Sequence, residues 1–447
     1  MATRESASAK VQVATAETSP ELRSPFRAKD NNTWPGAEPA LTPQAFLVCI
    51  LWLTQILLSP VYVFESGLPQ PADFLMVFLS LVVLLFRGFP LPRRGLPFLG
   101  LLVALATYTA IVNGWWYLKV GDSGLLLPSL YYFFNCIVFA TFLSLYTWLG
   151  RSLISLTCCA FAISALFQVV VSLQIVDISL NDFIRATLLF KNPNQTAYYA
   201  VLVGSFMLLC ARANLLPYFL RLWMPFFLAQ LGYIVALTQS RAGLASLGLI
   251  VGLFSIRRLT TGILLGSLLF LLARSPMGDQ LIQVISERVQ QKQKSLDEEL
   301  AYRGYARIWQ NREYLLFGAG EGAYERFEVL WGKELHSTFG NILMSYGVVG
   351  FVIICAFFWN LFRRCGWSNT IGFLPAFAYG LTHNGIRQSE FWMIAALAVC
   401  LYLERHRPQQ LPESQRLVGQ RSSLSPHFLA RPQVNLRGKR LVTSPAQ

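Results

Sequence analysis

Charged residues are scarce in this sequence. Asp, Glu, Lys and Arg make up 13% of its 447 residues and hydrophobic residues make up 54%, whereas charged residues form roughly 25% of an ordinary soluble domain. This composition places the chain in a lipid bilayer. The net charge of +14 would suit nucleic acid, but the basic residues gather in short connections and in the C-terminal tail. A membrane protein with basic cytoplasmic connections explains them better, so we expect no nucleic-acid partner.

The sequence also lacks the motifs of a disulfide framework, a metal site or an ion-driven transporter. Its eight cysteines lie in or beside apolar runs without a CxxC pair, and it contains no HExxH motif. The acidic run at 297–299 is typical of a helix start. Acidic residues elsewhere fall at the ends of apolar runs, and no internal repeat is visible, which argues against a transporter. We expect neither a metal nor a cofactor.

Apolar runs dominate the rest of the chain. A helix needs about 17–25 apolar residues to cross a bilayer, and twelve runs approach or reach that length. We therefore predict an all-α polytopic membrane protein of about 12 transmembrane helices, in which the last two runs could instead form a broken or re-entrant pair. The runs are 45–64, 72–86, 96–112, 126–149, 152–173, 195–210, 218–237, 242–256, 259–273, 339–361, 371–381 and 391–403.

One long polar stretch interrupts these runs between the ninth and the tenth. Its charges exclude it from hydrocarbon, and we expect it to form a helical loop domain, with helices over 279–294 and 296–316. The first residues are polar and have no apolar core of a secretory signal peptide. The predicted segments are a disordered cytoplasmic tail (1–43), helices 1–9 (44–273), the loop domain (274–335), helices 10–12 (336–403) and a basic disordered cytoplasmic tail (404–447).

The distribution of basic residues predicts the orientation. With the N-terminus in the cytoplasm, most Lys and Arg of the short connections lie inside, as the positive-inside rule requires. The long loop then faces outward, which in a bacterium means the periplasm. The short outer connections hold only Lys119, Arg185, Lys191, Arg241 and Arg387.

Arginines on this outer face point to a polyanionic ligand. Arg185 and Arg241 lie in outer connections, and Arg303 and Arg307 lie four positions apart in the loop. Guanidinium groups bind phosphate oxygens bidentately and stay charged at any working pH, so a lipid-linked pyrophosphate is the natural candidate. The alternatives are an interfacial anchor for Arg241 and a solvated loop residue for Arg185.

His336 is the only histidine in or beside the long loop, and it follows Glu334 by two positions. Histidine can take a proton at neutral pH, which an attacking sugar hydroxyl must lose. The alternative is a histidine that caps the following helix. His383, beside Asn384 on the same predicted face, competes for the same role.

Several motifs, in their order and spacing around the loop, resemble the O-antigen ligase and O-antigen polymerase superfamily. The likeness covers roughly residues 185–350. The motifs are Phe190-Lys191-Asn192-Pro193-Asn194, the segment 238–243 around Ser240-Arg241, Arg303 with Arg307-Ile308-Trp309, Gly318-Ala319-Gly320-Glu321-Gly322, and His336-Ser337 followed by Tyr346-Gly347 and Gly350.

The resemblance implies a metal-independent, inverting, integral-membrane glycosyltransferase. It would act on glycans carried by undecaprenyl pyrophosphate at the periplasmic face of the bacterial inner membrane. Arg185 and Arg241 would bind the pyrophosphate, and His336 would orient or deprotonate the acceptor hydroxyl. In the loop, Arg303 rather than Arg307 would support the leaving group. Further supporting candidates are Asn194, Glu321, Glu334 and His383.

The leading functional hypothesis is polymerisation of lipid-linked oligosaccharide repeat units in exopolysaccharide or O-antigen (lipopolysaccharide) biosynthesis. The first alternative is a ligase that transfers the same donor to lipid A core or to a protein. The second is a polysaccharide or lipid-carrier transporter that catalyses nothing. The expected partners are the undecaprenyl-pyrophosphate-linked donor, a glycan or lipid A core acceptor, the lipid bilayer, a chain-length regulator and a flippase.

Overall fold

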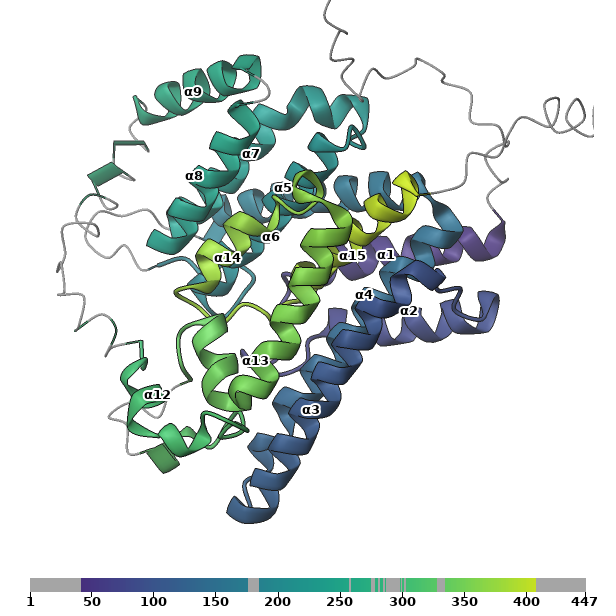
Figure 1. Ribbon diagram of the computed structural model, residues 1–447. Helices are drawn as coiled ribbons and strands as arrows, with labels where there is room; N and C mark the ends of the chain where they lie inside the picture. Colours follow the sequence, from purple (N-terminus) through teal and green to yellow (C-terminus); the bar gives the residue numbers. More distant parts are fainter. Residues whose placement is uncertain are drawn as a thin grey trace, which may run out of the picture. The chain divides into compact units, whose positions relative to one another are not determined.

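A computed structural model of the chain describes residues 42–175, 185–256, 259–274, 303–327 and 334–406, together with isolated positions between 278 and 300. The chain divides into two compact units, Met1–Phe46 and Leu47–Gln447, and the second unit holds nearly all of the described residues. Within the described residues all regular structure is helical and no strand occurs (Figure 1). The all-α prediction is therefore confirmed for this part of the chain.

Each predicted apolar run falls on a helix of the structure. Proline at the first or second position starts α2, α3, α4 and α6, where its missing N–H costs no hydrogen bond. The helices are α1 (Pro43–Leu58), α2 (Pro71–Arg87), α3 (Leu96–Val120), α4 (Leu127–Leu149), α5 (Arg151–Ile175), α6 (Pro193–Arg212), α7 (Tyr218–Thr238), α8 (Arg241–Ser255), α9 (Leu259–Ala273), α12 (Ala306–Gln310), α13 (Thr338–Cys365), α14 (Phe373–Gly380) and α15 (Ser389–Arg405). Short 3-10 turns are η1 (Arg93–Gly95), η2 (Ser123–Leu125), η3 (Arg312–Tyr314), η4 (Tyr324–Phe327) and η5 (Trp367–Asn369).

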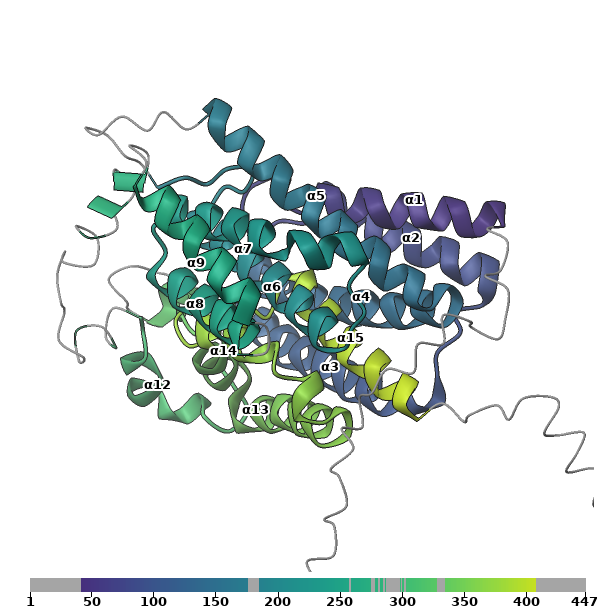
Figure 2. The same ribbon diagram turned by 90° about the horizontal axis from the view of Figure 1, so that it is seen from above.

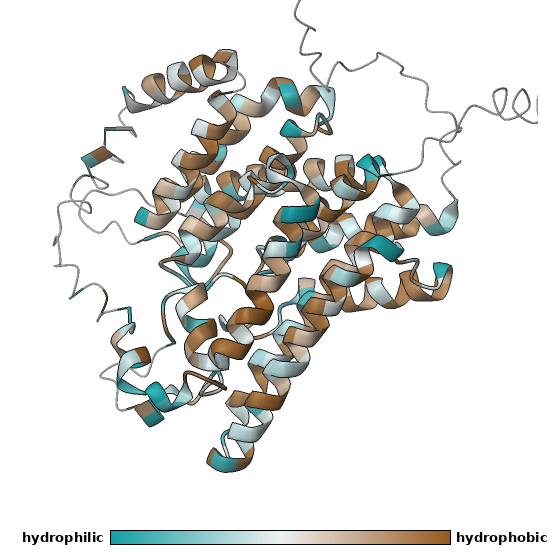
Figure 3. Cartoon of the chain, viewed as in Figure 1, coloured by the Kyte–Doolittle hydropathy of each residue, from teal (hydrophilic) through white to brown (hydrophobic). Residues whose placement is uncertain are grey.

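Five helical segments are long and apolar enough to cross a membrane. They are Arg93–Val120, Ser123–Leu149, Arg151–Gln174, Tyr218–Thr238 and Thr338–Cys365. Large apolar side chains such as Leu85 and Leu118 are 81% and 80% exposed, as expected for surfaces that contact lipid. Figure 3 shows hydrophobic residues along most helices and hydrophilic residues gathered in the connections. These helices indicate a membrane protein.

The last two expected spans differ from one another. Helix α14 has 8 residues and therefore extends only about 12 Å, which is too short to cross a hydrocarbon core of about 30 Å by itself. Helix α15 has 17 residues and is buried on all sides from Glu390 to Leu401. A helix that is apolar all round belongs in a core.

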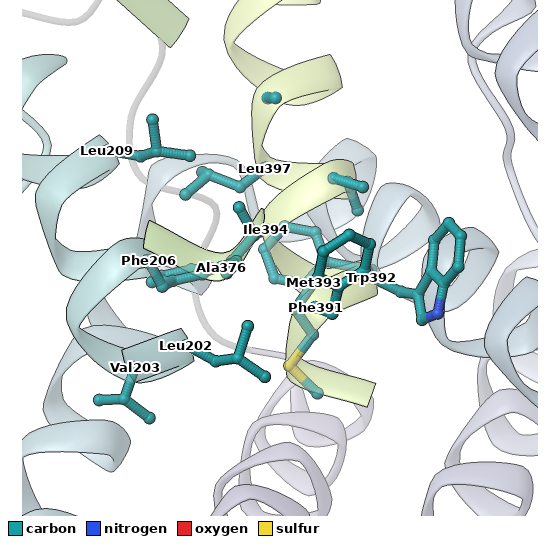
Figure 4. Packing of buried hydrophobic residues seen from close by; sticks show 14 of the residues in the cluster. Leu202, Val203, Phe206, Leu209, Ala376, Phe391, Trp392, Met393, Ile394 and Leu397 are labelled. Atoms are coloured by element: carbon teal, nitrogen blue, oxygen red, sulfur yellow. The ribbon is translucent and has the colours of Figure 1, made fainter. Parts of the chain in front are cut away.

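Helices α6 and α15 form the centre of the second unit. Helix α15 packs against α4, α6 and α13, and α6 also packs against α7, α8 and α14. Figure 4 shows side chains of α6, including Leu202 and Phe206, close to Phe391 and Ile394 of α15. All residues of α6 from Thr196 to Ala211 are buried. The sequence segments that precede these two helices are thereby held near one another.

The described part of the long loop is less helical than predicted. Of the helix expected over 296–316, residues 303–316 instead form the five-residue helix α12 and the turn η3. Gly304 adopts a positive φ of 81° and Asn311 has non-helical φ and ψ angles, so a continuous helix cannot pass through them. Figures 1 and 2 both place α12 beside α13. The helix expected over 279–294 lies almost entirely outside the described residues.

Candidate functional site

A break in α13 receives the glycine-rich end of the long loop. Gly347 has φ 65° and ψ −170° inside α13, a conformation accessible essentially only to glycine. The backbone N–H groups of Ala319 and Gly320 donate to the carbonyls of Met344 and Ser345, at 2.9 and 2.8 Å. In return, the N–H of Val348 donates to the carbonyl of Leu315 at 2.7 Å. The loop thus replaces hydrogen bonds that the helix loses at its break.

As a result of this insertion, the side chain of Glu321 lies inside the helix bundle. Its side chain is fully buried, with 0% of its surface exposed. The carboxylate accepts hydrogen bonds from Asn341, from the Tyr346 hydroxyl at 2.7 Å, from Asn384 at 3.4 Å and from Arg387. A buried charge is tolerated when it is paired and hydrogen-bonded, and Glu321 satisfies both conditions.

Arg387 joins Glu321 to the segment that carries His336. Its guanidinium also lies 3.1 Å from the carboxylate of Glu334. Burial alone would lower the pKa of Arg387, but the carboxylates of Glu321 and Glu334 raise it well above its usual value. Arg387 is therefore permanently charged and shared between two acids.

Three segments meet around His336. The backbone N–H of His336 donates to the carbonyl of Arg303 at 3.1 Å, and the Arg303 guanidinium donates to the carbonyl of Thr382 at 2.5 Å. Ser337 is the residue that caps α13, since its hydroxyl accepts from the N–H of Gly340. Helix capping is thus performed by Ser337, and His336 stands one position outside the cap.

His383 lies beside this junction in an aromatic stack. Its ring lies on that of Tyr379, with centroids 4.7 Å apart, and Tyr379 in turn stacks on Tyr198 at 4.5 Å. Burial lowers the pKa of His383 to about 3, and the positive charges of Arg303, of His336 when it is protonated, and of Arg185 act in the same direction. The imidazole is therefore neutral at physiological pH. Because Arg303, His336 and Arg185 all influence its pKa, these three residues lie close enough to His383 for their charges to act on it.

Arg185 is held by α6 and by the end of α7. Its Nε donates to the carbonyl of Thr238 at 2.9 Å, and its Nη2 donates to Oδ1 of Asn194 at 2.8 Å. Arg241 is the first residue of α8, three positions after Thr238, and its side chain is exposed. The chain therefore brings the start of α8 next to the site of Arg185.

A cavity of about 350 Å³ opens between these segments, within the size range of small-ligand sites. Four of the predicted residues line it, namely Asn194, Glu334, His336 and His383. Arg185 donates a hydrogen bond to the lining residue Asn194, and Arg303 donates one to the backbone of Thr382 next to His383. Arg185, Arg241, Arg303 and Glu321 are not themselves lining residues.

Arg307 has a different environment from the other arginines. It is buried against the rings of Tyr324 and Phe327, with its guanidinium carbon 5.7 and 5.8 Å from their centroids. Burial lowers the pKa of Arg307. The structure therefore places Arg307 within the packed part of the loop, apart from the cavity.

Part of the cavity wall consists of residues that the sequence does not single out. The connection between α1 and α2 contributes Ser59, Tyr62 and Gln70, and the starts of α2 and α15 contribute Asp73 and Glu390. The sequence signal that could have identified Asp73 and Glu390 was their position at the ends of apolar runs.

A search with protein-family models finds no match for this chain, and neither does a comparison with curated proteins.

Proposed function

We propose that this chain is a glycosyltransferase of the O-antigen ligase and polymerase superfamily that polymerises undecaprenyl-pyrophosphate-linked repeat units. The observation that carries the proposal is the cavity lined by His336 and His383, with Arg185 bonded to the lining residue Asn194 and Arg303 bonded to the backbone of Thr382 next to His383. Glycosyl transfer from a pyrophosphate donor requires a base and a set of fixed cations near the reacting groups.

The chemistry assigns one role to each group. An acceptor hydroxyl attacks the anomeric carbon of the donor sugar, the bond from that carbon to the pyrophosphate oxygen breaks, and the configuration inverts. His336 takes the proton of the hydroxyl. Arg185 and Arg241 bind the lipid-linked pyrophosphate, which gains one further negative charge as it leaves, and Arg303 supports this leaving group. Fixed cations that stabilise developing charge are commonly the largest catalytic contribution.

The neutral state of His383 supports His336 as the base. A second imidazolium beside His336 would oppose the positive charge that His336 gains with the proton. Because the pKa of His383 is held at about 3, no such charge arises at neutral pH. His383 and Asn194 are then polar wall residues that orient the sugar, whereas Glu321, Glu334 and Arg387 fix the segment before His336.

The proposed setting is the bacterial inner membrane, with about twelve helices, both tails in the cytoplasm and the cavity facing the periplasm. The basic inner connections support this orientation. A chain-length regulator and a flippase would work beside the enzyme. Neither a metal nor a cofactor takes part in the proposed reaction.

A gene deletion tests the proposal and separates it from ligation to lipid A core or protein. Loss of a polymerase leaves single lipid-linked repeat units, whereas loss of a ligase leaves lipid-linked polymer. Transfer by the purified protein, with the accumulated lipid-linked units as substrate, separates either enzyme from a transporter. Accumulation of single units and their elongation by the purified protein are the expected results. Unchanged glycans in the deletion strain would contradict the proposal.

A further inference from the structure

The cavity continues from the histidines toward the connection between α1 and α2, which is fixed in place by several hydrogen bonds. Ser59 donates to the carboxylate of Glu390, a contact between positions 331 residues apart. The amide of Gln195 donates to the hydroxyl of Ser66 at 2.7 Å, and the Tyr131 hydroxyl donates to the carbonyl of Gly67. This end of the cavity is therefore a preformed surface built from four separate parts of the chain.

The walls of the cavity are rich in hydrogen-bond acceptors. Oxygen atoms of the Gln195, Asn384 and Gln388 side chains are buried and have no hydrogen-bond partner among the described residues. The orientation of Asn384 is set by Glu321, which accepts from its NH₂ group and so leaves its oxygen for another donor. Buried acceptors without a donor are costly. A ligand that satisfies this wall must bring several donors.

Two carboxyl groups reinforce this polarity. Asp73 and Glu390 line the cavity at the starts of α2 and α15. Tyr62 lines the cavity together with them. Carboxyl oxygens accept from hydroxyl groups, and aromatic rings pack on the apolar faces of sugars.

The scarcity of cations in this lining disfavours an anion. Among the described lining residues, Asp73, Glu334 and Glu390 are acidic and Arg387 is the one arginine or lysine. Arg387 is already shared between Glu321 and Glu334. A phosphate or a sugar carboxylate at this end would face the carboxyl groups of Asp73 and Glu390 without a cation to pair with. The donor-rich ligand is therefore uncharged.

We propose that this end of the cavity, formed by Ser59, Asp73, Tyr131, Gln195 and Glu390, binds an uncharged sugar ring of the acceptor through its hydroxyl groups. This inference rests on the proposed function and narrows its substrate class, because it excludes uronic acids and phosphorylated sugars from this position. His336 lines the same cavity, so the bound sugar ring and the proposed base would face the same cavity.

The test uses the full-length protein in nanodiscs and saturation-transfer NMR. The probes are methyl glycosides of glucose, galactose and mannose, and the corresponding methyl uronides. At least one neutral glycoside should receive saturation, and its uronide should bind about tenfold more weakly or not at all, because its carboxylate would face hydrogen-bond acceptors without a cation to pair with. The double variant Asp73→Asn and Glu390→Gln should weaken the neutral glycoside about tenfold as well.

Glu404→Gln is the matched control, because Glu404 lies on the same helix as Glu390 but pairs with Arg151 away from the cavity. It should bind the neutral glycoside like the wild type. Equal binding of uronides, absence of binding by every neutral glycoside, or wild-type affinity of a folded double variant would overturn the subsite. Failure of glycosyl transfer with glycoside binding intact would instead overturn the proposed function alone.

Discussion

The guanidinium of Arg387 donates a hydrogen bond to the fully buried carboxylate of Glu321. The same guanidinium lies 3.1 Å from Glu334, two positions before His336. One cation thus ties the loop inserted into α13 to the segment that carries the proposed base. Because both acids reach Arg387 from the long loop, the position of His336 depends on how that loop docks.

Removal of either member of this pair should destabilise the protein strongly. Glu321→Gln leaves Arg387 less compensated, and Arg387→Met leaves a buried carboxylate unpaired, which costs about 3–5 kcal/mol. Thermal unfolding in detergent measures the effect. Glu404→Gln is the control, since the side chains of Arg151 and Glu404 are 53% and 22% exposed and such a pair contributes about 1 kcal/mol or less. Equal shifts in melting temperature for Glu321→Gln and Glu404→Gln would show that the pair of Glu321 with Arg387 does not stabilise the docked loop.

Gly347→Ala should also lower stability. A Cβ at position 347 would meet the backbone of Leu316, and its φ of 65° is strained for any L-residue, which costs about 1–3 kcal/mol before any clash. Gly252→Ala in α8 is the control, because no atom lies within 4 Å of the added Cβ and alanine favours a helix. We expect a lower melting temperature for the first variant and an unchanged or higher one for the second. A Gly347→Ala variant as stable as the wild type would contradict the loop insertion.

The lowered pKa of His383 predicts a specific pH dependence of the protein's stability. Its folded pKa of about 3 lies below the ordinary value of 6.5, so the unfolded chain binds the proton more readily. The stability that this group contributes is complete above pH 6.5 and is lost as the pH falls toward 3. His383→Gln removes this titration. Melting temperatures between pH 7 and pH 4 should fall more steeply for the wild type than for the variant, and parallel curves would refute the assignment.

Arg185→Lys should impair transfer although it keeps the charge. A lysine cannot reproduce the fork by which Arg185 holds both Thr238 and Asn194. Under the proposed function, a cation that is no longer held in place stabilises the leaving group less well, which lowers kcat by up to about 10²–10³, the cost of losing one stabilising donor. Arg363→Lys, at an exposed position in the last turn of α13, should leave the rate unchanged. A kcat for Arg185→Lys equal to that of the control would remove Arg185 from the proposed mechanism.

The helices could be predicted from the sequence, whereas much of the cavity could not. Apolar runs bounded by proline and glycine, such as those of α2 and α4, predict helix positions closely because each depends on local residues. The break at Gly347 and the burial of Glu321 depend instead on docking between segments far apart. The contact of Ser59 with Glu390 likewise joins residues that no local pattern relates.

The most direct measurement is elongation of a lipid-linked repeat unit by the purified protein and by its His336→Ala variant. Product length and rate would be followed with the lipid-linked units that accumulate in the deletion strain. The proposal predicts polymer from the wild type and a rate lower by about 10²–10⁴ for a folded His336→Ala variant, the usual contribution of a general base. Equal rates for the two proteins would contradict the role of His336, and no elongation by a folded wild type would contradict the proposed polymerase.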